Sequence, residues 1–171
     1  DLLFLQRSAN LHYLTGIPRE EQNFGNTMYP GEWLTGAWVA PGAPPILTIP
    51  RMLAAFHMDI QGYDVRVLPD AGDPAGLAGE VLAALGAPAA PTVALDERAW
   101  AETLLGIAAL RPAARFVSAA PIMRPLRLIK GEDELAIMRA AGAITEAAFQ
   151  DTLPRLRHGM STLDLISEVN Y

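Results

Sequence analysis

The sequence predicts an α/β domain in which a mixed β-sheet carries helices on both faces. β-prone runs alternate with helical segments along residues 2–130, an order typical of parallel strands joined by helices. One pair of runs, 34–40 and 46–49, flanks Pro41-Gly42-Ala43-Pro44-Pro45, which is a hairpin signal and adds an antiparallel pair. A hydrophobic fraction of 51% in 171 residues is ample for a buried core.

Each element follows from a local signal. Leu2–Gln6 is an apolar run that reads as a buried strand. Residues 8–14 are expected to form helical turns, with Ser8 or Asn10 as N-cap and Gly16 as the stop. Asp73 and Pro74 match the N-cap and first position of a helix that ends before Gly86. We also expect strands at 63–68, 92–95 and 115–118, and helices at 51–60, 97–110 and 119–130, the last interrupted by Pro125.

The last 40 residues follow a different pattern. A long helix is expected from about Glu132, with three acidic residues in its first turn and an end or kink at Pro154. One face of it is apolar, formed by Leu135, Met138, Ala141, Ile144 and Ala148. Ser161-Thr162-Leu163-Asp164 can cap a final helix. We therefore expect a sheet domain at 1–126 and a separate helical segment at 127–171.

The composition excludes several classes of function. A net charge of −6 argues against nucleic acid as a partner, because a phosphate backbone needs a basic surface. No apolar run approaches the roughly 18 residues that a membrane span needs. The chain has no cysteine, which excludes disulfides and a thiol nucleophile. With no signal peptide recognisable, we expect a cytoplasmic protein, and the strong preference for Arg over Lys indicates a bacterial source.

Residues that ligate metals are present but not in ligating patterns. His12, His57 and His158 are the only histidines, and none pairs with another at helical spacing. His57 and Asp59 lie two residues apart, so they would point to different faces of a helix. The three acids Glu132, Asp133 and Glu134 are explained by the positive end of the helix dipole. We therefore expect no metal site within this chain.

Three motifs carry a resemblance to a known family. Asn10–Gly16 is similar to the N-x-x-Y-L-T-G turn of the creatinase/prolidase/aminopeptidase P metallopeptidases. The most specific block is Arg127–Ala141, which resembles the junction between the N-terminal and catalytic domains of that family. Gly159–Leu165 looks like the start of the next catalytic-domain helix.

The resemblance implies a ribonuclease H-like creatinase N-terminal fold, followed by the first helices of a pita-bread catalytic domain that continues beyond Tyr171. It implies a parent enzyme that hydrolyses Xaa-Pro bonds, either a prolidase (Xaa-Pro dipeptidase) or an aminopeptidase P. Two divalent metals, Mn, Co or Zn, would be held by two Asp, one His and two Glu, all beyond the equivalent of Tyr171. There they would act as Lewis acids and generate the hydroxide nucleophile. No catalytic residue, metal ligand or cofactor is assigned to this chain, which we expect to be inactive alone.

The resemblance also implies that such a domain packs in a homodimer and projects loops over an active site, limiting access to short proline-containing peptides. Residues 17–33 have no periodicity and read as a long loop, of the kind that is often functional. Arg19, Tyr29 and Trp33 are the candidates for a substrate-gating rim, since Arg and aromatic side chains dominate binding surfaces. The alternative is an ordinary surface loop in which Tyr29, Pro30 and Trp33 fold onto the domain.

Other interpretations stay open. A family member that has lost its metal ligands would be a protein-binding module, and a creatinase would run an amidinohydrolase reaction without metals. A ribonuclease H-like nuclease would need carboxylates, here Asp1, Asp64 and Asp96, converging within a few ångströms. Against this, Asp64 is expected on the wet face of its strand, and Asp96 is explained as the cap of a following helix. Trp38 and Trp100 are expected to pack in the core or in an interface.

Overall fold

The computed structural model describes residues 1–17, 31–57 and 62–169. It divides the chain into two compact units, Asp1–Pro125 and Leu126–Tyr171, one residue from the boundary expected after residue 126.

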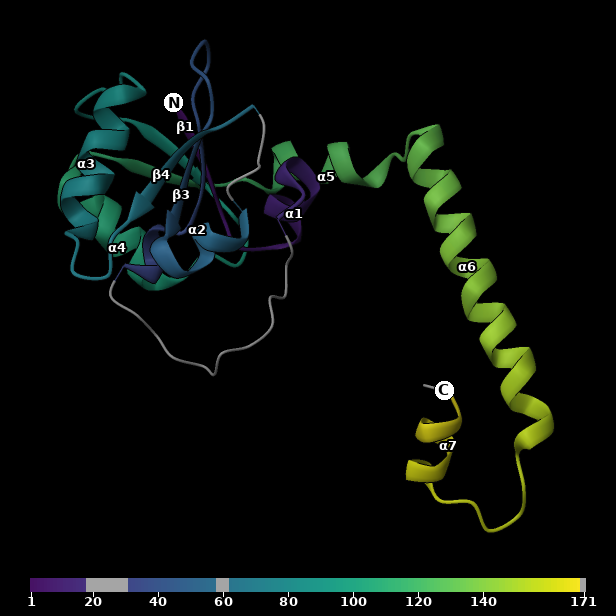
Figure 1. The fold of residues 1–171 in the computed structure, drawn as a ribbon. Coiled ribbons are helices and arrows are strands. Elements are labelled where there is room, and N and C mark those ends of the chain that lie inside the picture. The colour runs from purple at the N-terminus through teal and green to yellow at the C-terminus, as the bar shows by residue number, and fades with distance from the viewer. Residues whose placement is uncertain (18–30, 58–61, 170–171) are drawn as a thin grey trace. The chain divides into compact units, whose positions relative to one another are not determined.

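A six-stranded mixed sheet forms the centre of the first unit (Figure 1). The strand order is β4-β3-β2-β1-β5-β6, in which β2 runs antiparallel to β1 and β3 and the other neighbours are parallel. The predicted α/β class with a mixed sheet is confirmed. The strands are β1 (Leu2–Gln6), β2 (Gly36–Val39), β3 (Ile46–Pro50), β4 (Asp64–Leu68), β5 (Thr92–Leu95) and β6 (Arg115–Ser118).

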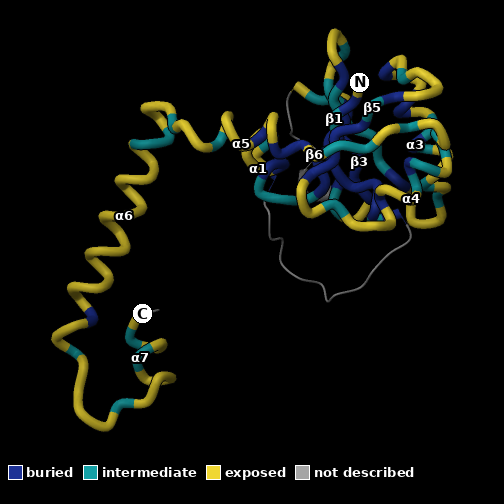
Figure 2. Tube along the Cα trace, turned by 180° about the vertical axis from the view of Figure 1, so that it is seen from behind, coloured by how far each residue is buried: buried dark blue, intermediate teal, exposed yellow. Residues whose placement is uncertain are grey.

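Side chains alternate along the strands into two hydrophobic cores, one on each face of the sheet. Phe4, Trp38 and Val93 pack on the face covered by α3 (Pro74–Ala84), α4 (Ala101–Leu110) and the short 3-10 helix η1 (Glu32–Leu34). Leu5 and Leu47 pack on the face covered by α1 (Ala9–Thr15), α2 (Arg51–His57) and α5 (Ala120–Leu128). Figure 2 shows the inner strands β1, β3 and β5 as largely buried, whereas the edge strands β4 and β6 are only partly buried.

Most local signals act as the sequence predicts. The Ser8 hydroxyl accepts from the backbone amides of Asn10 and Leu11, and Gly16 ends α1 in the left-handed conformation at φ 76°. Asp73 caps α3 by accepting from the amide of residue 75, with Pro74 at the first helical position.

Three boundaries differ from the prediction. The helix expected at 97–110 begins only at Ala101. The strand expected from Leu34 begins at Gly36, because η1 takes up Leu34 and the Thr35 amide bonds back to Glu32. Helix α5 runs through Pro125 instead of stopping there: its buried first turn holds it in place, and the proline removes only one backbone donor.

The second unit contains α6 (Glu132–Thr152), the 3-10 turn η2 (Leu153–Arg155) and α7 (Thr162–Val169). The predicted cap of the last helix is present, because the Ser161 amide donates to the Asp164 carboxylate at 2.8 Å and the Asp164 amide returns a bond to the Ser161 hydroxyl at 3.2 Å. Arg155 links the helices through Asp151 at 2.7 Å and Glu168 at 3.2 Å. Much of the apolar surface of α6 is exposed within this unit, including Ile137 and Ile144.

Candidate functional site

Polar side chains gather where the parallel strands β1, β5 and β6 reach their carboxyl ends. Gln6 ends β1, Asp96 and Glu97 follow β5, and Ser118 ends β6. Because these three strands are parallel neighbours, their ends meet at one side of the sheet. In α/β folds this side is where ligand-binding residues are usually placed.

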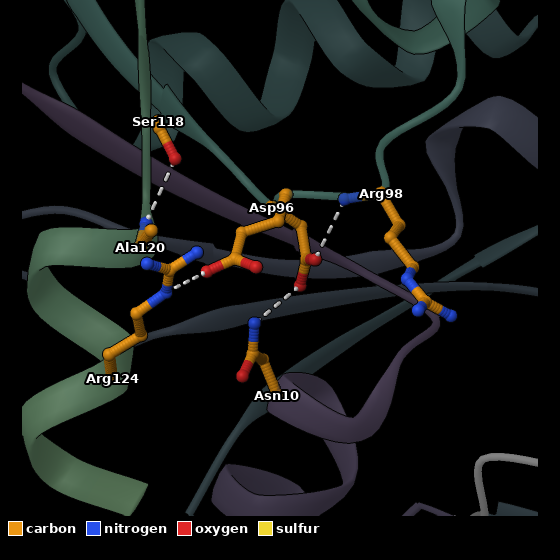
Figure 3. A network of polar contacts seen from close by, with 7 residues as sticks. Asn10, Asp96, Arg98, Ser118, Ala120 and Arg124 are labelled. Atoms are coloured by element: carbon orange, nitrogen blue, oxygen red, sulfur yellow. Dashed lines mark hydrogen bonds and ion pairs between the residues drawn. The ribbon is translucent and has the colours of Figure 1, made fainter. Parts of the chain in front are cut away.

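Asp96 is the centre of this group and is only 6% exposed. Its carboxylate accepts from the Ser8 hydroxyl at 2.7 Å, from the Asn10 amide group at 3.2 Å and from the Arg98 backbone amide at 3.3 Å (Figure 3 draws the last two). These donors supply the hydrogen bonds that a buried carboxylate needs. Asp96 therefore ties the end of β5 to the start of α1, and the expectation that it caps the following helix is wrong.

The same group of polar side chains explains why α4 starts later than predicted. The Arg98 amide donates to the Asp96 carboxylate, and the Trp100 amide donates to the Gln6 side-chain oxygen at 2.8 Å. These side-chain partners hold residues 96–100 in a turn, since short polar side chains compete with helical hydrogen bonds. The helix can begin only after them.

A cleft of about 330 Å³ opens beside this group, between α4 and β6. Its lining combines the carboxylates of Asp96 and Glu97 with apolar surface from Trp100, Leu104 and Phe116, together with Leu95, Ala99, Ala101, Val117 and Ser118. Glu97 is ion-paired with Arg124 of α5 at 2.9 Å, and the Ser118 hydroxyl accepts from the Ala120 amide at 3.1 Å, both shown in Figure 3.

The polar side chains that line the cleft are already engaged with other residues of the domain. Its serine, Ser118, accepts from the Ala120 amide, and the residues that line the cleft include no histidine. Among residues 1–17, 31–57 and 62–169, no group of three or more His, Asp or Glu is placed to hold a metal ion.

The structure separates the three acids considered for nuclease chemistry. Asp64 begins the edge strand β4, whereas Asp96 follows β5, and three strands lie between β4 and β5 in the sheet. Asp1 precedes β1, at the opposite end of the strands from Asp96. The nuclease interpretation lacks its required geometry. His12 contacts the backbone oxygen of Ile17 at 2.8 Å through Nδ1, while Asp59 lies outside the described residues.

Of the three gating candidates, only Trp33 lies within the described residues; Arg19 and Tyr29 lie outside them. Trp33 is 7% exposed and belongs to the core between the sheet and α4. Its backbone oxygen accepts from the Thr103 hydroxyl at 2.9 Å, and its ring lies against Gly106. This position agrees with the alternative in which Trp33 folds onto the domain.

The residues on either side of 18–30, Ile17 and Gly31, are packed against the domain on opposite faces of the sheet. Ile17 is buried in the core beneath α1, and its amide donates to the Thr15 hydroxyl at 3.1 Å. At the other end, Gly31 adopts φ 90° and a β-carbon there would lie 2.3 Å from a methyl carbon of Leu68. Only glycine meets both conditions.

Two ionisable groups near these ends have shifted pKa values. Burial raises the pKa of Glu32, and the charge of Arg7 partly offsets that rise. Burial also raises the pKa of Tyr63, whose hydroxyl donates to the backbone oxygen of Leu14 at 2.9 Å. The Tyr63 phenol thus stays protonated and keeps the end of α1 attached to β4.

Sequence reasoning did not find the group around Asp96 or the cleft. The usable signal was the recurrence of polar residues directly after β1, β5 and β6. What the pattern does not reveal is that Trp38 is fully buried whereas Trp100 is 39% exposed at the cleft.

The sequence matches no protein-family model and no curated protein sequence. Solved structures match closely in shape. One is a dipeptidase from Pyrococcus horikoshii OT3, with a TM-score of 0.78 and 20% identity over 99% of this chain. Another is an X-Pro aminopeptidase from Thermotoga maritima MSB8, with a TM-score of 0.75 and 18% identity over 100%. A third is the creatinase/prolidase N-terminal domain of an X-Pro dipeptidase from Streptococcus pyogenes, with a TM-score of 0.56 and 16% identity, covering 73% of this chain and 86% of that domain.

The chain has the creatinase/prolidase N-terminal fold. This confirms the fold that the motifs at residues 10–16 and 127–141 implied. The match to the Pyrococcus and Thermotoga enzymes extends through α6 and α7, since it covers at least 99% of the chain, yet it spans only 44% and 45% of those enzymes. Within the described part of the chain, no helix is both long enough and apolar enough to cross a membrane.

Proposed function

We propose that this chain is the non-catalytic N-terminal part of an Xaa-Pro peptidase of the creatinase/prolidase family, either a prolidase or an aminopeptidase P. The main support for this proposal is the extent of the structural match, which includes the sheet unit and the helices that follow it. The Arg127–Ala141 segment, which resembles the family's domain junction, lies where the first unit gives way to the second. A bacterial, cytoplasmic enzyme is part of this proposal, in keeping with the absence of cysteine.

In this proposal the chemistry belongs to the rest of the enzyme. Two divalent metals, Mn, Co or Zn, would polarise the Xaa-Pro carbonyl and supply the hydroxide there. The present chain contributes homodimer contacts and limits which peptides reach the active site. The support for this division is the cleft around Asp96, whose polar groups are engaged in holding α1, α4 and α5 together.

The 17–33 segment is the part that we propose to gate the substrate. Its anchors, Ile17 and Trp33, lie in the two different cores of the sheet domain. Trp33 therefore serves as an anchor, and the contacts to peptide fall to Arg19 and Tyr29. An arginine and a tyrosine are suited to this task, because one pairs with a peptide carboxylate and the other packs on a proline ring.

The test of the activity uses the enzyme encoded by the full reading frame, loaded in turn with Mn, Co and Zn. We expect hydrolysis of an Xaa-Pro dipeptide or an Xaa-Pro-Xaa tripeptide, and none of the matching Xaa-Ala peptide. Metal-independent hydrolysis of creatine would instead identify a creatinase. A protein that neither binds these metals nor cleaves either substrate would be a binding module.

The gating proposal needs its own measurement. In the same enzyme, Arg19→Ala and Tyr29→Ala should change the ratio of kcat/KM between an Xaa-Pro dipeptide and a longer proline-containing peptide. Glu80→Ala, on the exposed surface of α3, is the control and should leave that ratio unchanged. Unchanged ratios in all three variants would refute gating by this segment without affecting the peptidase assignment.

A further inference from the structure

The connection between α5 and α6 is held by side chains of opposite charge. Helix α5 ends at Leu128 and α6 begins at Glu132, so residues 129–131 join the two helices. Lys130 lies in the middle of this connection and is the only lysine of the chain. The bonds that this lysine makes bear on how α5 ends.

Helix α5 has little support of its own. It is 9 residues long, below the roughly 12–15 residues at which isolated helices become marginally stable, and it contains Pro125, which removes a backbone donor. Its buried residues, Ala120 and Met123, both lie in its first half. In its last turn, by contrast, Leu128 is 78% exposed. The C-terminal half of α5 therefore depends on local hydrogen bonds more than on core packing.

The Lys130 ammonium supplies such bonds. The last carbonyl groups of a helix have no partner within the helix itself. Nζ of Lys130 donates to the backbone oxygen of Arg127 and, at 3.5 Å, to that of Leu128. Its positive charge lies at the end of the helix where the dipole is negative, which stabilises the helix further. Lys130 is therefore a C-terminal cap of α5.

Glu134 caps the other side of the connection. Its carboxylate accepts from the Gly131 amide at 2.9 Å, and the Leu135 amide donates to the Gly131 backbone oxygen at 3.0 Å. The negative charge lies in the first turn of α6, where the helix dipole is positive. Packing adds little here, because Ile129 is 77% exposed and the buried residue of α6, Thr152, lies at its far end. Each helix end at the connection is thus stabilised by a charge of favourable sign.

We propose that Lys130 is an acylation-sensitive latch, which holds the last turn of α5 and releases that turn when its amine is acylated by an acyl phosphate. In this step the neutral amine attacks the acyl carbon and a C–N bond forms. The C–O bond to phosphate breaks, phosphate leaves with the electron pair, and the nitrogen loses a proton to water. The product has no charge and one N–H in place of three. It therefore loses the interaction with the helix dipole and cannot keep both bonds to the carbonyl groups.

The position of Lys130 suits this reaction. The side chain is partly exposed and its neighbours Leu128 and Ile129 are exposed, so a small acyl donor can reach the amine. Because the chain has no other lysine, it is also the only side-chain amine present. The inference goes beyond the proposed peptidase function and does not depend on it, since every bond involved lies within residues 127–135.

Acetyl phosphate and amide hydrogen exchange, followed by NMR, test the latch on the 171-residue chain. Mass spectrometry should locate an acetyl group on Lys130. Exchange of the amides of residues 126–128 should then become about two- to tenfold faster, the range expected for losing a charge and a charged hydrogen bond at a helix end. Lys130→Gln, which is uncharged, should show the same acceleration without the reagent. Amides of β1 and β5 should exchange as before, because the core is not altered.

Lys130→Arg is the matched control, because arginine keeps the charge and can donate to both carbonyl groups. It should exchange as slowly as the unmodified chain, and acetyl phosphate should not change its rates, since its remaining amine is the N-terminal one. Equal rates in the Arg and Gln variants would refute the cap. A Lys130 that stays unmodified while the N-terminal amine is acetylated would refute the acylation step. Acceleration that extends to β1 and β5 would indicate loss of the fold and would also overturn the latch. None of these results bears on Xaa-Pro hydrolysis, which is measured separately.

Discussion

Replacing Gly106 by alanine should destabilise the sheet unit, although Gly106 lies inside a helix, where alanine is normally preferred. A β-carbon at residue 106 would lie 2.9 Å from Cη2 and Cζ3 of Trp33 and 3.0 Å from Cε3. Trp33 cannot move aside easily, because it is 7% exposed and its backbone oxygen is bonded to Thr103. The ring and the new methyl group would compete for the same space.

The expected magnitude is the difference between two opposing effects. Alanine is favoured over glycine in a helix interior by about 1 kcal/mol. Forcing an extra methyl group into a packed core costs about 1–3 kcal/mol. The net loss for Gly106→Ala is therefore between about 0 and 2 kcal/mol. The control is Gly79→Ala in α3, where no atom lies within 4 Å of the new β-carbon and only the helix preference acts. It should stabilise by about 0.5–1 kcal/mol.

Urea unfolding followed by tryptophan fluorescence measures both variants. All three tryptophans, at residues 33, 38 and 100, belong to the Asp1–Pro125 unit, so the signal reports that unit alone. Trp33→Phe removes part of the ring that blocks residue 106, so adding Gly106→Ala should cost less in that background. The reasoning is refuted if Gly106→Ala stabilises as much as Gly79→Ala, or if its cost is the same with phenylalanine at position 33.

Three further predictions concern single hydrogen-bonded groups. Asp96→Ala removes an acceptor of the buried Asn10 side chain and of the partly buried Ser8 hydroxyl, and should cost about 1–3 kcal/mol by urea unfolding, with Asp96→Asn costing less. Thr48→Val removes the acceptor of the Trp38 indole N–H, now at 2.9 Å, and should also cost about 1–3 kcal/mol, whereas Thr48→Ser should cost less; equal costs would contradict this account. Hydrogen bonds from Ser161 lower the pKa of Asp164, so α7 should keep its cap above the usual value of 3.8 and lose helicity, seen by circular dichroism, as the pH falls through the lowered pKa. Ser161→Ala should remove that part of the pH dependence.

The features that the sequence predicted correctly depend on neighbours within a few residues. Ser8, Gly16 and Asp73 begin or end helices because their side chains or backbone angles satisfy local amides. The alternation of apolar residues likewise determines which strand side chains face a core.

The predictions that failed concern residues whose partners lie far away in the chain. Asp96 looked like a helix cap, yet its partners Ser8 and Asn10 are 88 and 86 residues away. The same long-range contacts delay α4 to Ala101, through the bond between Gln6 and the Trp100 amide. Local propensity contains no information about such partners, so it placed the helix too early.

The sequence by itself therefore determined the class of fold, the helix caps at Ser8, Gly16 and Asp73, and the motifs at residues 10–16 and 127–141, because all of these follow from local spacing. Only the tertiary structure decided that Trp33 is packed against Gly106, that Asp96 connects β5 to α1, and that β4 and β6 are the edge strands of the sheet. The physical reason is that burial, edge position and long-range hydrogen bonds depend on strand order, and the order β4-β3-β2-β1-β5-β6 is set by packing of the whole domain.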